Sequence, residues 1–245
     1  MIKHVYIKEY YSVKKRMTEV ISYISLVTGA ILLFWSFYPI VSFEIYSRLF
    51  IQRDVLSPIP RSQLAFSLNT GGSVLGSYQI YSSNLRDFVQ ANLWFPTMSQ
   101  TNTPSNIEIK EYYLTIPKLN IADAKVIVGG NDLSKSLIHY IPTTLPGEYG
   151  NVNIFGHSSL PQLYNSKDYK TLFTYLPSIE KGDKVIIKIG SIKYEYEAYD
   201  MFVVKPDQVS VLEQRYDAAY LTLITCVPPG TYWNRLVVKA KLSKI

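Results

Sequence analysis

Two kinds of hydrophobic pattern divide this chain of 245 residues. Residues 20–43 contain no charged side chain, and at ~1.5 Å per residue such a helix is long enough for a hydrocarbon core of roughly 30 Å. From Tyr112 onward, short apolar runs rich in β-branched and aromatic residues alternate with turn residues, which is typical of strands. The pattern therefore predicts an N-terminal membrane-spanning helix followed by a β domain.

Seven or eight short strands with few helices favour a closed β-barrel, because closure removes the free edges of a sheet. The clearest pair is a hairpin that turns at Gly190-Ser191. Short helices are expected near residues 169–176 and from Asp207, which can cap a helix end after Pro206. The most evident strands cover residues 112–116, 124–128, 151–155, 184–189, 192–204, 220–226 and 235–242.

The composition shifts between the apolar run and the β domain. Residues 44–110 are rich in Ser, Pro, Gly and Asn, so a stalk or linker is expected there, with a short helix near residues 83–93. Trp94-Phe95-Pro96 is too apolar to stay in water; packing against the barrel is expected, and a lid over a functional site is the alternative. The predicted parts are a tail (1–19), a membrane anchor (20–43), a linker (44–110) and a barrel (111–245).

The charges indicate an orientation for the anchor. Lys14, Lys15 and Arg16 directly precede the apolar run, and basic residues favour the cytoplasmic side. No small-x-small cleavage site follows the run, which favours an uncleaved single-pass anchor with the barrel outside the cell. The net charge is +6, but the other basic residues are scattered, so no nucleic-acid partner is expected.

The one cysteine, Cys226, lies at the end of a predicted strand. Alternation along this strand puts Leu223 and Thr225 on the core face and Ile224 and Cys226 on the opposite face. The Pro-Pro-Gly turn that follows cannot continue a ladder. A lone cysteine is more often a buried small hydrophobe than a nucleophile, so Cys226 alone is weak evidence for catalysis.

Two other residues change that picture. His157 follows Gly156 at the end of an earlier strand, and Arg235 begins the strand after Cys226, which places a permanent charge near the thiol. Of the other histidines, His4 is expected across the membrane, and His139 is expected to be a hydrogen-bonded structural residue in a loop. Taken singly, His157 would more often be structural than catalytic, and Arg235 could be an ordinary surface arginine.

Taken together, these motifs resemble the sortases. The carriers are Thr-Leu-Ile-Thr-Cys ending at Cys226, Arg-Leu-Val-Val beginning at Arg235, and the strand-terminal Gly156-His157. The resemblance covers roughly residues 112–242. The Cys-to-Arg spacing and the Pro-Pro-Gly turn are less like class A than like classes C, D or E, and most like class D. No Asp-Pro-aromatic lid motif of the pilin-building class is evident.

The resemblance implies an eight-stranded barrel and a cysteine transpeptidase. It assigns Cys226 as nucleophile, His157 as general acid and base, Arg235 as oxyanion or substrate ligand, and Thr225 as part of the substrate groove. The implied partners are exported proteins with an LPxTG-like sorting signal and an amine acceptor, either a peptidoglycan precursor or a pilin lysine. No cofactor is implied, and no carboxylate cluster suggests a calcium or other metal site.

Other readings of the same residues are less well supported. L,D-transpeptidases place His-Gly-Cys close together before Arg, and papain-like proteases begin a helix with Cys-Gly-Ser-Cys-Trp; neither motif is present. The alternative from a different class is a catalytically inactive, membrane-tethered barrel that binds peptides. Retention of Cys226, His157 and Arg235 together favours the enzyme.

Overall fold

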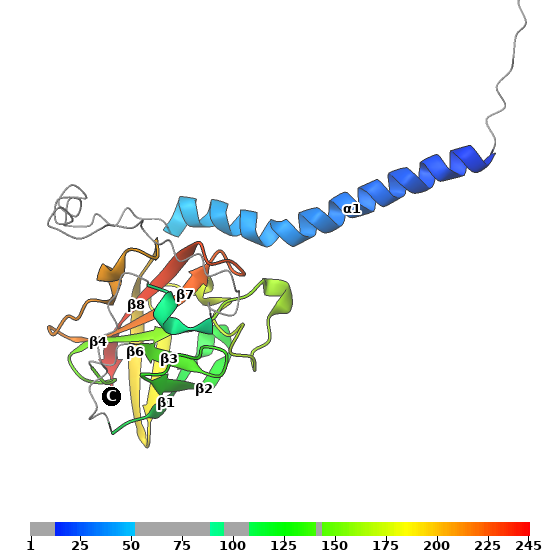
Figure 1. The fold of residues 1–245 in the computed structure, drawn as a ribbon. Coiled ribbons are helices and arrows are strands. Elements are labelled where there is room, and N and C mark those ends of the chain that lie inside the picture. Colours follow the sequence, from blue (N-terminus) through cyan, green and yellow to red (C-terminus); the bar gives the residue numbers. More distant parts are fainter. Residues whose placement is uncertain (1–12, 52–88, 96–107, 141–143) are drawn as a thin grey trace, which may run out of the picture.

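The computed structural model describes residues 13–51, 89–95, 108–140 and 144–245. Its body is a closed barrel from which one long helix, α1, extends (Figure 1). The strand order is β1-β2-β3-β4-β7-β8-β6-β5, and pairing of β1 with β5 closes the barrel. The predicted mainly β fold is therefore confirmed. The strands are β1 (Glu111–Ile116), β2 (Ile121–Val128), β3 (Leu137–Tyr140), β4 (Gly150–Phe155), β5 (Lys184–Ile189), β6 (Ile192–Val204), β7 (Ala219–Val227) and β8 (Asn234–Lys244).

Hydrophobic side chains lie on both faces of β4 and β7. Ile154 and Leu223 point into the barrel and belong to its interior core. Phe155 and Ile224 belong to a second apolar cluster, which also contains Trp94. Each strand therefore separates two apolar layers, and every residue of both strands is buried. This second layer lies on the outer face of the barrel, where Cys226 also lies.

One strand was missed by the sequence pattern. His139, expected in a loop, lies in β3, which pairs in parallel with β2 and antiparallel with β4. Three of the four residues of β3 are buried. Because both faces of the strand are covered, its sequence does not alternate between polar and apolar residues. A buried strand this short has no periodic signature that separates it from an apolar loop.

The expected helices are wrong in type. Residues 170–175 form turns that end in a 3-10 helix, η6 (Leu176–Ser178). After Asp207 the chain forms only the 3-10 helix η7 (Val209–Leu212). Of the helix expected near residues 83–93, residues 83–88 lie outside the described part, and the rest contains the 3-10 helix η3 (Ala91–Leu93). The other described 3-10 helices are η4 (Pro117–Leu119) and η5 (Pro161–Leu163).

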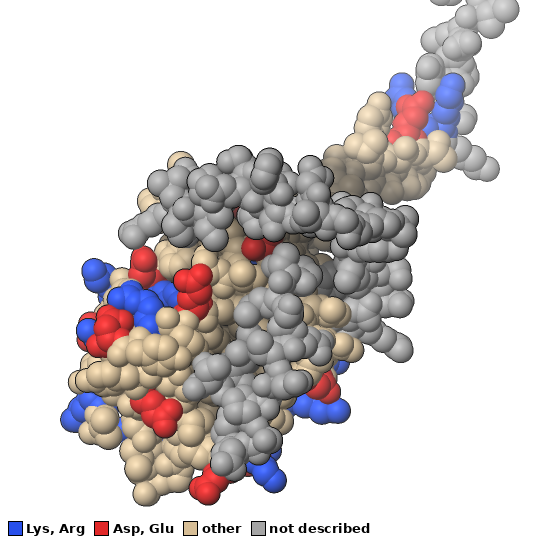
Figure 2. Space-filling view, turned by 60° about the vertical axis from the view of Figure 1, so that its left-hand side comes forward, with Lys and Arg blue, Asp and Glu red and all other residues tan. Residues whose placement is uncertain are grey.

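The N-terminal helix α1 (Val13–Tyr46) is long and apolar enough to cross a membrane. It continues into a π-helical turn, η1 (Ser47–Ile51), whose Ser47 and Ile51 are buried against the barrel. Figure 2 shows basic side chains on either side of an acidic one at the N-terminal end of the helix, and interspersed basic and acidic side chains on the barrel face. The C-terminal end of α1 is thus packed on the barrel, while the rest extends away from it (Figure 1).

Candidate active site

Three neighbouring strands bring the predicted catalytic residues to one end of the barrel. Strand β7 pairs in parallel with β4, with Phe155 opposite Ile224, and antiparallel with β8, with Cys226 opposite Arg235. His157 follows Phe155 by two residues, as Cys226 follows Ile224, so the two reach matching positions at the same strand ends. Cα atoms of directly opposed antiparallel residues lie about 5 Å apart. Cys226 therefore lies between His157 on one side and Arg235 on the other.

His157 is held in place through its backbone. The Gly156 N–H donates to the Ile224 carbonyl at 3.1 Å, and the His157 carbonyl accepts from the Phe173 N–H at 2.9 Å. A Cβ atom on Gly156 would lie 2.5 Å from the Phe173 ring and 2.6 Å from Leu137. Only glycine permits this close approach, which is why it precedes the histidine.

Thr225 and Ser158 join the two strand ends. The Thr225 hydroxyl donates to the Gly156 carbonyl at 2.8 Å, and the Ser158 hydroxyl donates to the Cys226 carbonyl at 2.6 Å. Thr225 is fully buried and its side chain is engaged between β7 and the end of β4. The expected role of Thr225 in a substrate groove stays a prediction. Both hydroxyls fix the backbone around Cys226 relative to that of His157.

Trp94 covers the site. Its indole stacks on Phe155, with ring centroids 5.3 Å apart, and meets the His157 ring edge-on at 5.7 Å. The Arg235 guanidinium lies 5.4 Å from the indole centroid and donates to the Trp94 carbonyl from Nε at 3.3 Å and Nη2 at 3.0 Å. Trp94 thus contacts two of the three predicted catalytic residues. With this cover in place, Cys226 is only 2% exposed.

The covering segment, residues 89–95, is tied to the connection between β2 and β3. The Ala91 N–H donates to the Asn131 carbonyl at 2.9 Å, and the Leu133 N–H donates to the Val89 carbonyl at 2.9 Å. Phe95 is also fully buried and packs on Phe155, whereas Pro96 lies outside the described residues. A few backbone bonds and two aromatic side chains therefore hold the cover.

Burial keeps both reactive groups uncharged in this closed arrangement. Burial raises the pKa of the Cys226 thiol, and the nearby Arg235 charge opposes that rise only in part. Burial, helped by the Lys170 charge, lowers the pKa of His157 to about 4. The His157 Nε2 atom is buried and has no hydrogen-bond partner in the part of the chain that the structure describes. At neutral pH the closed site therefore holds a thiol and a neutral imidazole.

Tyr232 is a further residue at the site that the sequence did not indicate. Its carbonyl accepts a hydrogen bond from Arg235 Nη1 at 3.0 Å. Burial and the nearby Cys226 thiolate both raise the pKa of the Tyr232 hydroxyl. No motif points to Tyr232 or to Trp94. The only signal for Trp94 is its strong apolarity within a polar linker.

His139 is not part of this site. It is fully buried in β3, and burial lowers its pKa to about 3. Neither ring nitrogen has a hydrogen-bond partner among the described residues, so the expected hydrogen-bonded role is wrong. Its ring instead meets Tyr112 edge-on at 5.9 Å. The described residues also include no group of three or more His, Cys, Asp or Glu that could hold a metal ion.

Comparison with known proteins identifies the family. Residues 114–243, more than half of the chain, match the Sortase domain. The chain belongs to the sortase family. Sortase D of Bacillus subtilis is 28% identical over 117 residues, covering 47% of this chain and 53% of that protein. Sortase SrtE1 of Streptomyces coelicolor is 25% identical over 189 residues, covering 68% and 51%.

Among solved structures, sortase C1 of Streptococcus agalactiae superposes with a TM-score of 0.51 at 26% identity, covering 62% of this chain and 78% of that one. The chain spans about half the length of each of the two curated relatives, Sortase D and Sortase SrtE1. The matched region includes Cys226, His157 and Arg235 but not Trp94. The cover over the site therefore lies outside the sortase domain that defines the family.

Proposed function

We propose that this sortase is a membrane-anchored cysteine transpeptidase. It would cleave a C-terminal, LPxTG-like sorting signal of exported proteins and join them to an amine, either of a peptidoglycan precursor or of a pilin lysine. The observation that carries the proposal is the meeting of Cys226, His157 and Arg235 at one end of β4, β7 and β8, within a sortase domain.

The first half of the reaction forms an acyl-enzyme. The Cys226 proton moves to His157, and the thiolate sulfur attacks the scissile carbonyl carbon. Arg235 donates hydrogen bonds to the oxygen as it becomes negative. The C–N bond then breaks, and the leaving amine takes its proton from the His157 imidazolium. A thioester on Cys226 and a neutral imidazole remain.

The second half releases the product. The acceptor amine attacks the thioester carbonyl, and His157 takes the proton that the amine loses. The C–S bond breaks, the thiolate leaves, and the imidazolium returns its proton to the sulfur. Arg235 again stabilises the oxyanion. An amide is exchanged for an amide, so no oxidant, reductant or cofactor is needed.

Substrate entry requires displacement of the 89–95 segment. The Trp94 carbonyl accepts two hydrogen bonds from Arg235, the same donors that the oxyanion needs. Departure of Trp94 would free these donors, expose Cys226 and His157 to water, and remove the burial that keeps both uncharged. Thr225 then acts as a positioning residue, because its hydroxyl fixes the ends of β4 and β7.

The anchor is proposed to have its N-terminus in the cytoplasm and the barrel outside. The support is the basic cluster before the apolar run and a helix long enough to span. Protease added to intact cells should digest the barrel and spare the N-terminal tail. Protection of the barrel in intact cells would contradict this orientation.

Mass spectrometry of the intact protein tests the activity. Incubation with a library of sorting-signal peptides should give a thioester adduct on Cys226 that hydroxylamine removes, and Cys226→Ala should give none. Trp94→Ala serves as an opened form in the same assay. The absence of any adduct from both wild type and Trp94→Ala, with the barrel still folded, would reject the transpeptidase.

One observation favours a second candidate, an inactive tethered barrel that binds peptides. The Cys226 thiol is nearly inaccessible, and burial raises its pKa, as expected of a structural cysteine. Peptide binding that is unaffected by Cys226→Ala, without adduct formation in any variant, would select this candidate.

A further inference from the structure

A groove of about 700 Å³ separates α1 from the barrel. One wall is the C-terminal part of α1, including Tyr38, Phe43 and Tyr46. The other comes from the connection after β4, which supplies Tyr175, and from the β7–β8 turn, which supplies Pro229. A volume of this size is within the roughly 300–1,000 Å³ range of small-molecule sites. The barrel wall lies within the matched sortase domain and the α1 wall lies outside it, and the catalytic proposal does not use this groove.

The lining is apolar and uncharged. None of the twelve described residues that line it is Asp, Glu, Lys or Arg; four are prolines and four are aromatic. A neighbouring hollow of about 430 Å³ shares Tyr46 but contains Glu180, Lys181 and Asp200. Charge is therefore present beside the helix–barrel junction but absent from the groove itself. The polar lining residues, Ser42, Gln162, Thr174 and Ser178, each donate to a backbone carbonyl. Such a lining suits a hydrocarbon chain and offers no charge to a phosphate or carboxylate.

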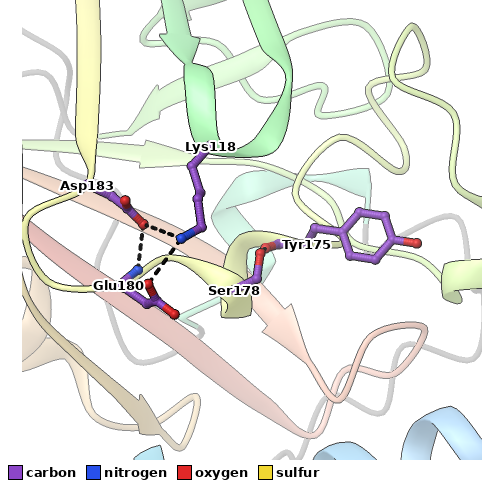
Figure 3. Close-up of polar contacts among 5 residues, drawn as sticks. All are labelled: Lys118, Tyr175, Ser178, Glu180 and Asp183. Atoms are coloured by element: carbon purple, nitrogen blue, oxygen red, sulfur yellow. Dashed lines mark hydrogen bonds and ion pairs between the residues drawn. The ribbon is translucent and has the colours of Figure 1, made fainter.

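The barrel wall of the groove is held by polar contacts on its far side. Lys118 Nζ lies 3.1 Å from Glu180 and 3.6 Å from Asp183, and Ser178 donates to the Tyr175 carbonyl at 2.7 Å. The Tyr175 ring points away from this ion cluster (Figure 3). The segment is thus tied to η4, which precedes β2.

The groove begins where the bilayer ends. A hydrocarbon core of roughly 30 Å takes about 20 helical residues, so a span that starts at Val20 reaches the neighbourhood of Pro39. The α1 residues that line the groove are Tyr38, Pro39, Ser42, Phe43 and Tyr46, at and just beyond that boundary. The apolar surface of α1 is therefore continuous from the bilayer into the groove.

Two connections that line the groove also carry exposed apolar side chains. Leu163, directly after the lining residues Pro161 and Gln162, is 63% exposed, and Trp233, in the same turn as Pro229, is 60% exposed. Exposed Trp and Leu side chains of this kind are favoured at a membrane surface. Two connections of the barrel therefore present apolar side chains beside the helix that would enter the membrane.

We propose that an acyl chain of a phospholipid, from the leaflet that faces the barrel, occupies this groove. The chain enters along α1 and packs between Phe43 and Tyr175, while its head group stays at the water interface. The bound lipid fixes the barrel on the membrane surface, with the β7–β8 turn, and so Cys226 and Arg235, at a set height above it. This inference rests on the proposed membrane anchoring.

Fluorescence quenching by lipids tests the proposal on the full chain. Cys226→Ala removes the only cysteine, and Ser178→Cys then places a nitrobenzoxadiazole label in the groove. The protein is reconstituted in phosphatidylcholine vesicles with or without a doxyl group midway along the acyl chain. Matched labels at Ser25→Cys in α1 and at Ile192→Cys serve as controls; Ile192 begins β6 in the hairpin that lies away from α1 (Figure 1).

The label at position 178 should lose at least half of its emission in doxyl lipid, as should the label at 25, whereas the label at 192 should be unchanged. Adding Ser42→Trp, which fills the groove, should restore emission at 178 and leave quenching at 25 intact. Quenching at 25 without quenching at 178 would overturn the proposal, as would an unquenched label at 25 or an ineffective Ser42→Trp.

A second copy of the chain is the competing occupant. Disulfide-linked dimers of the unlabelled Ser178→Cys variant in vesicles, together with no lipid quenching at position 178, would assign the groove to that copy and overturn the lipid. Because every protein in this experiment carries Cys226→Ala, the outcome is independent of catalysis. Failure of the lipid proposal and failure of the transpeptidase proposal therefore give different results.

Discussion

The outer face of β4, β7 and β8 carries a set of three polar side chains near each of its two ends, and the two sets differ in their hydrogen bonds. At one end, Asn151, Thr222 and Lys239 come from the three strands and bond to one another. Lys239 Nζ donates to Thr222 at 2.9 Å and to the Val211 carbonyl at 2.6 Å, and Thr222 donates to Asn151 at 2.7 Å. Burial lowers the Lys239 pKa to about 8, yet its ammonium has partners. This end is a closed polar network that holds η7 on the sheet.

At the other end, His157, Cys226 and Arg235 come from the same three strands or follow them directly, but no described hydrogen bond joins their side chains. His157 Nε2 has no described partner, and Arg235 gives two hydrogen bonds to a segment far away in sequence, through Trp94. A buried group without a partner costs stability. The polar network therefore supports the fold. At the other end, His157 Nε2 is unpaired among the described residues and Arg235 bonds to a segment outside the barrel, so both could bond to a ligand once Trp94 leaves.

The largest expected effect is loss of activity at the second end. His157→Ala and Arg235→Ala should each lower transpeptidation by about 10²–10⁴-fold while the barrel stays folded, with a lower melting temperature for Arg235→Ala because the Trp94 carbonyl loses its donors. Arg235→Lys keeps the charge but not the planar donor fork, so it should recover little activity. Peptide-transfer rates and thermal unfolding measure both quantities. Full turnover in Arg235→Ala would remove its proposed role.

The opposite result is expected at the polar network. Thr222→Val leaves Asn151 Oδ1 and Lys239 each short of one buried partner, which costs about 1–3 kcal/mol of unfolding free energy. The turnover of the remaining folded enzyme should stay within about twofold, because Thr222 lies four residues from Cys226. Urea unfolding together with active-site titration measures the two effects. A large loss of turnover would break the division between the two ends.

The cover over the reactive end gives a smaller effect. Trp94→Ala removes the ring that stacks on Phe155 and His157, so iodoacetamide should modify Cys226 about tenfold faster, as expected for a lower local opening energy. Trp233→Ala is the matched control, since Trp233 is exposed and should leave the rate unchanged. Equal modification rates in wild type and both variants would show that Trp94 does not limit access.

The smallest effect is on pH dependence. Burial lowers the His157 pKa from 6.5 to about 4, so between these values the unfolded chain binds more protons than the folded one. The contribution of His157 to stability should therefore fall as the pH drops from 6.5 towards 4, by at most ~1.4 kcal/mol per pH unit, and His139 adds a second loss of the same sign. His157→Gln should flatten the slope in urea unfolding. The slope that remains comes from His139, whose pKa burial lowers to about 3.

The parts of the fold that follow from local pattern could be predicted. Alternation located β7 and assigned Ile224 and Cys226 to one face, and the hairpin turn at Gly190 was evident. The helix expected at residues 169–176 failed because Leu172, Phe173 and Leu176 have helical spacing but other partners: the Phe173 N–H bonds to the His157 carbonyl. Such tertiary hydrogen bonds leave no trace in periodicity.

The candidate site was predictable only where motif and strand end coincide. Cys226 and Arg235 lie next to the ends of β7 and β8 and His157 lies just beyond β4, and the structure brings them together. The contact between Trp94 and Arg235 spans 141 residues, and no local rule connects positions so far apart. Thr225 was placed correctly on the core face, but strand alternation does not reveal that its hydroxyl meets the Gly156 carbonyl.

The closure of the barrel limits how this protein can recognise a peptide. Each of the eight described strands has a neighbour on both sides, but residues 199–204 of β6 pair with β8 and not with β5. An extended peptide therefore finds room for only a short run of backbone bonds at such a place, rather than a full ninth strand. Under the proposed function, side-chain contacts with loops would then carry most of the selectivity for a sorting peptide, and the rest of the exported protein would be free to vary.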